Sequence, residues 1–377
     1  MKKIALSLFV AFSAFAKAPT PKCKPLAERL SIHDVAVTET IATSSLADNP
    51  GSFGQGATLR PIVLGIQPDQ AVKVGWVDTK GVTHITALDK NLKATGKEVT
   101  VPGMLRDFVA HNEGSAVLTQ GGGMHLTRFD NELGQIFRVR LIGNPTNNMH
   151  MGSLAYDGVH YRSYFGITGT SGYQAGHQGE ALVQTDTNGA SSVLRGWGCS
   201  HAIDARYITY DDKFFALCLS DAFPSMGLFF NHGFFKGIAG DKSGGSSGRI
   251  AGMVGVDGNI AIAYTAYERA HLEIVDAGTR ARIHSWPLPY APGKDKNLKV
   301  ARFGQKRVLV SWKRGEEQVV KVYSLEGEGA LEEESDNIGA WAHPRGDFKT
   351  FANGDVAWAT QWVDSKILRV MRLNYCE

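Results

Sequence analysis

A short apolar segment that recurs at even intervals constrains the fold of this sequence more than any other feature. Successive copies start about 44 to 53 residues apart, and a turn containing Gly or Asp precedes most of them. The seven copies are Val72–Trp76, Ala116–Thr119, Tyr161–Phe165, Phe214–Cys218, Ile260–Tyr264, Val308–Trp312 and Val356–Thr360. Self-similarity at a fixed period of this length predicts a repeat architecture.

A second segment with alternating apolar and polar residues follows many of these copies and ends in a polar turn. Examples are His125–Phe129, Leu182–Asp186, Leu272–Asp276 and Val320–Ser324. A unit of about four short strands repeated every 40 to 50 residues is typical of a β-propeller blade. The 43 glycines also suit many tight turns. We therefore predict an all-β fold, a seven-bladed β-propeller over residues 59–377. Two unrelated sandwiches are the alternative, but they leave the even spacing unexplained.

The two ends of the repeat region complement each other. The chain ends before the last unit has an outermost strand. Residues 30–42, which precede the first full unit, alternate between apolar and polar residues as a strand does. We expect the N-terminal segment, residues 17–58, to supply this strand to the last blade, since ring closure removes two open sheet edges.

The first sixteen residues predict export. Lys2 and Lys3 precede an apolar run, Ile4–Phe15, and Ala14-Phe15-Ala16 follows the A-x-A pattern of a cleavage site. We interpret residues 1–16 as a secretory signal peptide. No later stretch approaches the ~20 apolar residues that span a bilayer. We expect a periplasmic or secreted protein with no membrane span.

Four cysteines in an exported chain predict disulfides. Cys23 and Cys376 lie near the two ends of the chain, so a bond between them would staple the ends together. Cys199 and Cys218 flank an apparent strand pair and are expected to meet across a hairpin. Free, buried thiols are the alternative.

Charge excludes one class of partner. The net charge is +3 and no Lys/Arg-rich run occurs, so the sequence lacks the cationic footprint of a nucleic-acid-binding protein. A small molecule, a glycan or a protein is the expected ligand, and the chain is expected to be a monomer.

The glycines at 121–123 do not open a helix, which argues against a phosphate cradle. The acidic run at 326–336 predicts a solvated outer turn.

Two motifs carry a family resemblance. They are His177-Gln178-Gly179-Glu180 and Trp197-Gly198-Cys199-Ser200-His201. The sequence resembles a family of exported bacterial β-propeller proteins with His-x-Gly-Asp/Glu and Trp-Gly-Cys-Ser-His motifs. That resemblance supports the fold and points to these motifs as the region of interest, but it implies no reaction.

The repeat register brings these motifs together. Residues 166–179 and 196–203 belong to connections on one face of the predicted propeller. The candidate ligand-binding residues there are His177, Glu180, Trp197, Ser200, His201 and Asp221. In the alternative structural interpretation, Ser200 and His201 cap buried backbone groups, and Trp197 fills space between blades.

A metal-dependent enzyme is the competing functional hypothesis for this face. Imidazole ligands suit Zn²⁺ or Cu²⁺, and the candidate ligands are His150, His177, His201 and His232. No catalytic residue is assigned. Ser200 and His201 are neighbours on an extended segment, so their side chains point apart and do not form a nucleophile–base pair.

Overall fold

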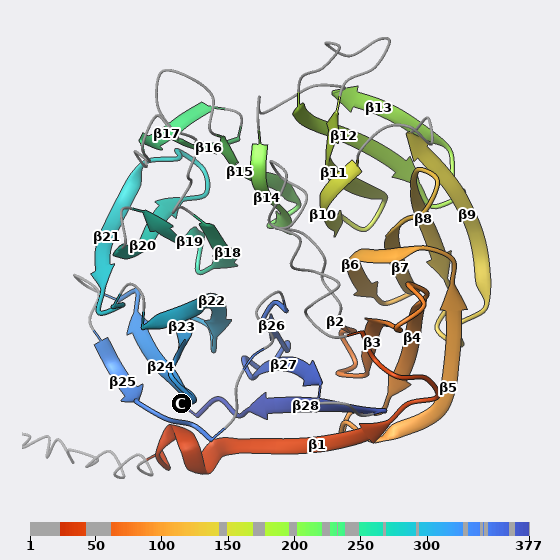
Figure 1. The fold of residues 1–377 in the computed structure, drawn as a ribbon. Helices are drawn as coiled ribbons and strands as arrows, with labels where there is room; N and C mark the ends of the chain where they lie inside the picture. The colour runs from red at the N-terminus through yellow and green to blue at the C-terminus, as the bar shows by residue number, and fades with distance from the viewer. Residues whose placement is uncertain are drawn as a thin grey trace, which may run out of the picture.

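The structure is a computed structural model of residues 1–377. It describes residues 23–42, 62–142, 149–168, 178–195, 202–220, 227–231, 233–237, 249–266, 269–291, 294–326, 331–339, 342, 346–361 and 366–376. The described chain forms seven four-stranded antiparallel sheets arranged as blades around a ring, as Figure 1 shows. The prediction of a seven-bladed β-propeller is confirmed.

The first three blades follow one another along the chain. Blade one contains β2 (Ile62–Ile66), β3 (Val72–Val77), β4 (Thr83–Leu88) and β5 (Ala94–Val101). Blade two contains β6 (Met104–His111), β7 (Gly114–Gln120), β8 (Met124–Phe129) and β9 (Gln135–Ile142). Blade three contains β10 (Met149–Tyr156), β11 (His160–Thr168), β12 (Gln178–Asp186) and β13 (Ser191–Arg195).

Blades four to six repeat this order. Blade four contains β14 (Ala202–Tyr210), β15 (Lys213–Ser220), β16 (Gly227–Phe230) and β17 (Gly233–Gly237). Blade five contains β18 (Arg249–Val256), β19 (Asn259–Ala266), β20 (Arg269–Asp276) and β21 (Arg282–Leu288). Blade six contains β22 (Asp295–Phe303), β23 (Arg307–Arg314), β24 (Glu317–Ser324) and β25 (Leu331–Ser335).

Blade seven joins the two ends of the chain. It contains β26 (Lys349–Thr350), β27 (Val356–Gln361), β28 (Ile367–Leu373) and β1 (Leu30–Ala36). β1 pairs antiparallel with β28 from Leu30↔Leu373 to Ala36↔Ile367. The expected closing strand within residues 30–42 is therefore present. The helix assigned in the described residues is a short 3-10 turn, η1 (Leu26–Arg29).

The recurring apolar segments all form the second strand of a blade. All six residues of β3, for example, are buried. Neighbouring blades cover both faces of each sheet, so these strands are apolar on both sides instead of alternating. This packing explains why the second strands gave the strongest repeat signal.

Aspartates shape the turns between the third and fourth strands. Asp89, Asp130, Asp186 and Asp276 each accept two backbone N–H groups through Oδ1. Asp side chains favour such turns because they replace a backbone acceptor locally. The polar turns expected after the alternating segments are therefore built on one recurring aspartate.

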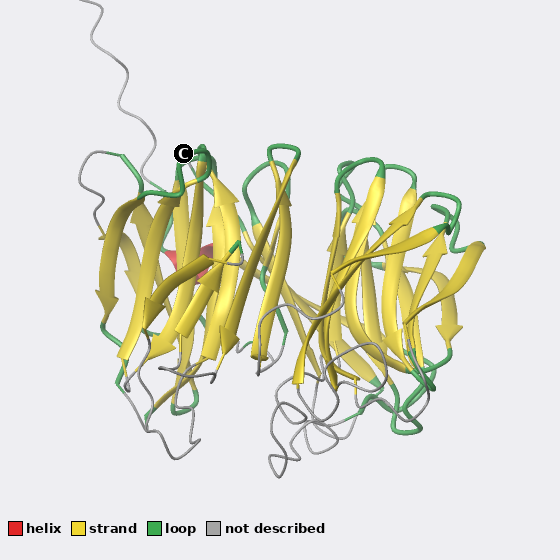
Figure 2. Cartoon of the chain, turned by 90° about the horizontal axis from the view of Figure 1, so that it is seen from above, coloured by secondary structure: helices red, strands yellow, loops and turns green. Residues whose placement is uncertain are grey.

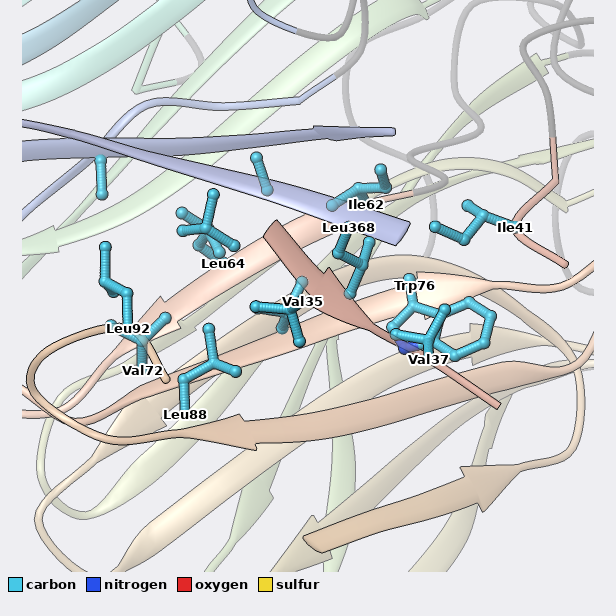
Figure 3. Packing of buried hydrophobic residues seen from close by; sticks show 14 of the residues in the cluster. Val35, Val37, Ile41, Ile62, Leu64, Val72, Trp76, Leu88, Leu92 and Leu368 are labelled. Carbon is cyan, nitrogen blue, oxygen red and sulfur yellow. The ribbon is translucent and has the colours of Figure 1, made fainter. Parts of the chain in front are cut away.

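Apolar packing and a disulfide hold the closing strand. Val35 and Val37 pack with Leu64, Trp76 and other buried residues between blades seven and one, as Figure 3 shows. Cys23 and Cys376 form the expected disulfide. The segment before β1 and the end of the chain are thus joined covalently, next to the β1–β28 pairing.

The acidic run was predicted wrongly as a solvated turn where it forms β25. Glu332, Glu333 and Glu334 pair with Arg307, Arg29 and Lys321, respectively. Arg29 is buried and belongs to η1. Arg29 and Arg307 lie far from the run in sequence, so its local composition gave no sign of them.

The strands run between two faces of the ring, seen from the side in Figure 2. One face carries the connections between the second and third strands of each blade and the connections from one blade to the next, and we call it the loop face. We call the opposite one the turn face. In the described part of the chain, no helix is long and apolar enough to cross a membrane.

Candidate functional site

The predicted site lies at the loop-face end of the interface between blades three and four. β11 ends at Thr168 and β12 begins at Gln178, while β13 ends at Arg195 and β14 begins at Ala202. The antiparallel order of each blade brings these four strand ends to the loop face. The blade assignment that underlies the predicted site is therefore correct.

Most of the predicted site residues lie outside the part of the chain that the structure describes. His177, Trp197, Ser200, His201, Asp221 and His232 lie outside the described residues. Glu180 is in β12 and is described, and His150 is in β10. The described part of the predicted site consists of the strands that flank the connections.

Backbone register brings His150 and Glu180 into one row. His150 pairs with Gly166 across β10 and β11, and Gly166 pairs with Glu180 across β11 and β12. The row lies near the loop face, where β10 and β12 begin. The structure thus places two of the predicted residues on one line across three strands.

Glu180 is a fully buried carboxylate, at 0% exposure. The Tyr164 hydroxyl donates a hydrogen bond of 3.2 Å to Glu180 Oε2. Tyr164 and Leu182 pack against Ala205 and Tyr207 of blade four. Glu180 lies two residues from Leu182 along β12, so it projects from the same sheet face, toward blade four. A buried carboxylate needs such polar partners because desolvation disfavours its charge.

Cys218 belongs to the same buried cluster. It is disulfide-bonded, and Cys199, its expected partner, lies outside the described residues. None of the described cysteines is free. Glu180 and the disulfide-bonded Cys218 therefore converge on one interface.

Aromatic rings continue this interface toward the turn face. The ring centroids of Tyr164 and Tyr207 are 5.5 Å apart, and those of Tyr207 and Phe214 are 5.4 Å apart. The Arg162 guanidinium lies 4.6 Å from the Phe214 centroid. Burial raises the pKa of Tyr207. Packed rings of this kind hold the neighbouring strands rigidly.

Blade five contains a comparable buried pair on the other side of blade four. The Tyr264 hydroxyl donates a hydrogen bond of 2.8 Å to Glu273 Oε1, and Glu273 is 0% exposed. Arg282 Nε lies 3.0 Å from Glu273 Oε2. Burial and the adjacent Glu273 carboxylate raise the pKa of Tyr264. This pair provides a chemical match to Glu180 outside the predicted site.

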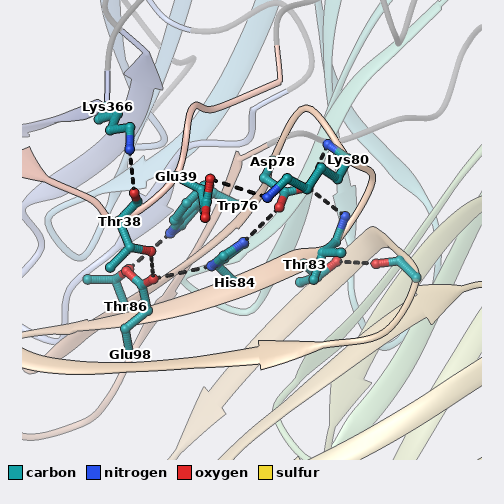
Figure 4. A network of polar contacts seen from close by, with 12 residues as sticks. Thr38, Glu39, Trp76, Asp78, Lys80, Thr83, His84, Thr86, Glu98 and Lys366 are labelled. Carbon is teal, nitrogen blue, oxygen red and sulfur yellow. Dashed lines mark hydrogen bonds and ion pairs between the residues drawn. The ribbon is translucent and has the colours of Figure 1, made fainter.

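A polar network that sequence reasoning missed lies at the loop-face end of blade one (Figure 4). His84 Nε2 is 3.2 Å from Asp78 Oδ2, and His84 Nδ1 is 3.2 Å from Glu98 Oε1. Trp76 stacks on the His84 ring with centroids 4.0 Å apart. Thr38, just beyond β1, donates a hydrogen bond to Glu98. The network ties the closing segment to blade one. Its signal in the sequence was the two-residue spacing of His84 and Thr86, which places both side chains on one face of β4.

Metal ligands do not gather within the described residues, where no group of three or more His, Cys, Asp or Glu side chains could hold a metal ion. The predicted ligands His177, His201 and His232 lie outside those residues, and the side chain of His150 is not described. The metal hypothesis therefore stays a prediction.

No family model and no curated protein matches the sequence. Solved structures do match the fold. A chain in a crystal structure of the mitotic checkpoint complex is 9% identical, with a TM-score of 0.56 and 100% of both chains covered. BBS1N, solved in complex with ARL6DN, is 12% identical, with a TM-score of 0.50 over 90% of this chain and 98% of that chain. At these identities the likeness extends to the fold alone.

Proposed function

We propose that this protein is exported and binds a small molecule, a glycan or a protein on the loop face of blades three and four. The observation that carries the proposal is the convergence of Glu180 and disulfide-bonded Cys218 on one buried interface. The connections 169–177, 196–201 and 221–226 start from the strands of this interface. A rigid scaffold that presents loops at one face is a common basis for binding.

Disulfide chemistry supports export. The Cys23–Cys376 bond joins residues separated by 353 positions, and disulfides persist mainly in oxidising compartments. The signal peptide proposed at residues 1–16 and the resemblance to exported propeller proteins agree with this location. We propose a periplasmic or secreted monomer.

Binding, without chemistry, is the simpler function for this site. Propeller folds host many unrelated activities, so the fold itself does not define a reaction. The described part of the interface offers one buried carboxylate held by a tyrosine, together with packed aromatic and apolar groups. Such a setting stabilises the base of a binding surface, because it fixes the strands from which the loops extend.

A ligand screen with paired variants tests this proposal. The mature protein is screened on a glycan array and, by thermal shift, against a panel of small metabolites. Each ligand found is then titrated against Glu180→Gln and against the matched control Glu273→Gln, which alters a buried Tyr–Glu pair outside the site. We expect Glu180→Gln to weaken binding by about tenfold or more and Glu273→Gln to leave it unchanged. Equal effects of both variants would contradict the proposed location.

The second candidate function is a metal-dependent enzyme at the same face. The shared backbone row of His150 and Glu180 favours it, because it brings an imidazole residue and a carboxylate residue to one line. Zn²⁺ or Cu²⁺ would be held by His150, His177, His201 and His232. Metal analysis of protein purified without a His-tag tests this hypothesis. Stoichiometric Zn or Cu that is lost in His177→Ala and His201→Ala would favour the enzyme, and metal-free protein would favour the binding function.

A further inference from the structure

A basic cluster lies on the face of blade two that packs against blade one. Across β8 and β9, His125 pairs with Arg140 and Thr127 pairs with Arg138. Thr127 also pairs with Val117 of β7, and Val117 packs with Val101 of blade one. Directly paired residues project from the same side of an antiparallel sheet. His125, Arg138 and Arg140 therefore share the face turned toward blade one.

The two arginines are spaced to hold one group between them. They are alternate residues of β9, so their Cα atoms lie about 6.6 Å apart along the strand. Arg140 is exposed, and Arg138 is half-buried. Guanidinium groups on stems of this length converge readily on one oxyanion, for which their donor geometry is well suited.

No carboxylate lies on either of the two sheet faces around this cluster. The blade-one residues turned toward it are Thr83, Ile85, Ala87, Val99 and Val101. The other residues of the blade-two face include Leu105 and Phe108 of β6 and Ser115, Val117, Thr119, Thr127 and Phe129 of β7 and β8. Within the described residues, neither arginine forms an ion pair, and the polar contact of Arg138 is a 3.3 Å hydrogen bond to the Pro102 carbonyl. No carboxylate of the described residues compensates the positive charge of the two arginines.

Buried donor atoms in the cluster also lack partners. Arg138 Nε and His125 Nδ1 are both inaccessible to solvent and make no hydrogen bond within the described residues. Buried polar atoms are usually satisfied, by the protein, by ordered water or by a ligand. These two atoms come from neighbouring strands of the same sheet face.

The turn between β7 and β8 lies beside Arg140. A Cβ atom at Gly123 would lie 2.8 Å from Arg140 Nε. A side chain at this position would displace the Arg140 guanidinium from its place across this turn. The turn is at the loop face, so the cluster opens near the connections between blades.

We propose that His125, Arg138 and Arg140 form a binding site for a sulfate or phosphate group at the loop-face end of the interface between blades one and two. The arginines supply charge-assisted hydrogen bonds, and His125 adds a third donor when it is protonated. This site is separate from the one proposed on blades three and four, so either can fail without the other.

Protonation of His125 couples this site to pH. Burial lowers the pKa of His125, and the nearby Arg138 and Arg140 charges lower it further, while a hydrogen bond with the Gly123 backbone partly opposes this shift. Thr119, its direct neighbour on β7, does not titrate. Val99 and Val101 of the facing sheet are apolar, and Lys97, further along β5, is paired with Glu132. A bound anion reverses the effect of the arginines and favours the imidazolium. Anion affinity therefore rises as the pH falls.

Titration with inorganic sulfate tests the site. Sulfate stays doubly charged across the range in which histidine titrates, so any pH dependence comes from the protein. At low ionic strength, calorimetry should show one saturable site, and the NMR resonances of His125 and of the arginine Nε–H groups should shift. Arg138→Gln and Arg140→Gln should each weaken binding by about tenfold or more. His125→Asn should remove the pH dependence.

Arg269→Gln is the control, because it removes an exposed arginine from β20 in blade five and should leave binding unchanged. If a Gln variant does not fold, Arg138→Lys and Arg140→Lys replace it, and weaker binding with the charge retained still supports the site. Inorganic phosphate and glycerol phosphate distinguish a free anion from an ester by their relative affinities. Sulfate binding that is unchanged in Arg138→Gln and Arg140→Gln would overturn the proposal. Shifts confined to residues outside β8 and β9 would overturn it as well.

Discussion

Removing the Cys23–Cys376 bond should destabilise the ring without abolishing it. The perturbation is the double variant Cys23→Ser/Cys376→Ser. The bond closes a loop of 353 residues, for which the chain-entropy model gives about 6 kcal/mol of stabilisation at 25 °C as an upper limit. Residual structure in the unfolded chain reduces this figure. We expect the free energy of unfolding to fall by about 3 to 6 kcal/mol.

The folded ring should persist because other closure contacts remain. β1 keeps its pairing with β28, and Arg369 Nε and Nη2 donate hydrogen bonds of 2.7 and 2.8 Å to Asp34. Arg29 still pairs with Glu333. Circular dichroism should therefore show unchanged β-structure in the variant.

Equilibrium unfolding in urea and hydrogen exchange measure the effect. Each single variant, Cys23→Ser or Cys376→Ser, should reproduce the whole loss, since either one breaks the bond. Amide exchange should accelerate in β1 and β28 more than in β19, on the far side of the ring. A loss below about 1 kcal/mol, or equal acceleration in all blades, would refute the reasoning that the bond stabilises ring closure.

Three further changes test the packing and electrostatics of the ring. Asp107→Ala should lower the free energy of unfolding by about 2 to 3 kcal/mol in urea titrations, because buried Asp107 accepts the Leu154 N–H of the next blade at 2.7 Å. Gly189→Ala should cost about 1 to 2 kcal/mol. Its φ is +94° and a Cβ would lie 3.1 Å from blade two, whereas Gly158→Ala, at φ +97° in open space, should cost less. Burial lowers the pKa of His111 to about 4, so stability should be highest above about pH 6.5 and fall toward pH 4, and His111→Gln should flatten that slope in thermal melts.

The sequence predicted the blades well because their signal is local. A second strand such as Val72–Val77 is buried on both faces. The turn before it can be recognised from a few adjacent residues. The closing strand was also predictable, since Leu30–Ala36 alternates and the last unit lacks one strand. The Cys23–Cys376 bond followed from the positions of two cysteines near the chain ends.

Features that depend on distant residues were not predictable. The first strands of blades two to six each carry one extra residue in their pairing with the second strand, as at Leu105/Asp107. A bulge changes the register by one residue and leaves no mark in composition. The acidic residues of β25 were misjudged because Arg29 and Arg307 meet them only in the folded ring.

The sequence predicted the strand boundaries around the candidate site, and the site itself stays a prediction. The register correctly grouped the strand ends around Glu180 and Cys218. It did not show that Glu180 is fully buried and bonded to Tyr164, because burial depends on the packing of blade four. The arginines of β9 drew no attention, since charges two residues apart on an outer strand commonly face solvent.

Hydrogen exchange with a bound ligand tests the central proposal, binding at the loop face of blades three and four, most directly. The measurement compares amide exchange of the mature protein with and without a saturating ligand from the screen. We predict slower exchange in β12 (Gln178–Asp186) and β15 (Lys213–Ser220), with β20 and β23 unchanged. Protection that appears only in blades five to seven would contradict the account.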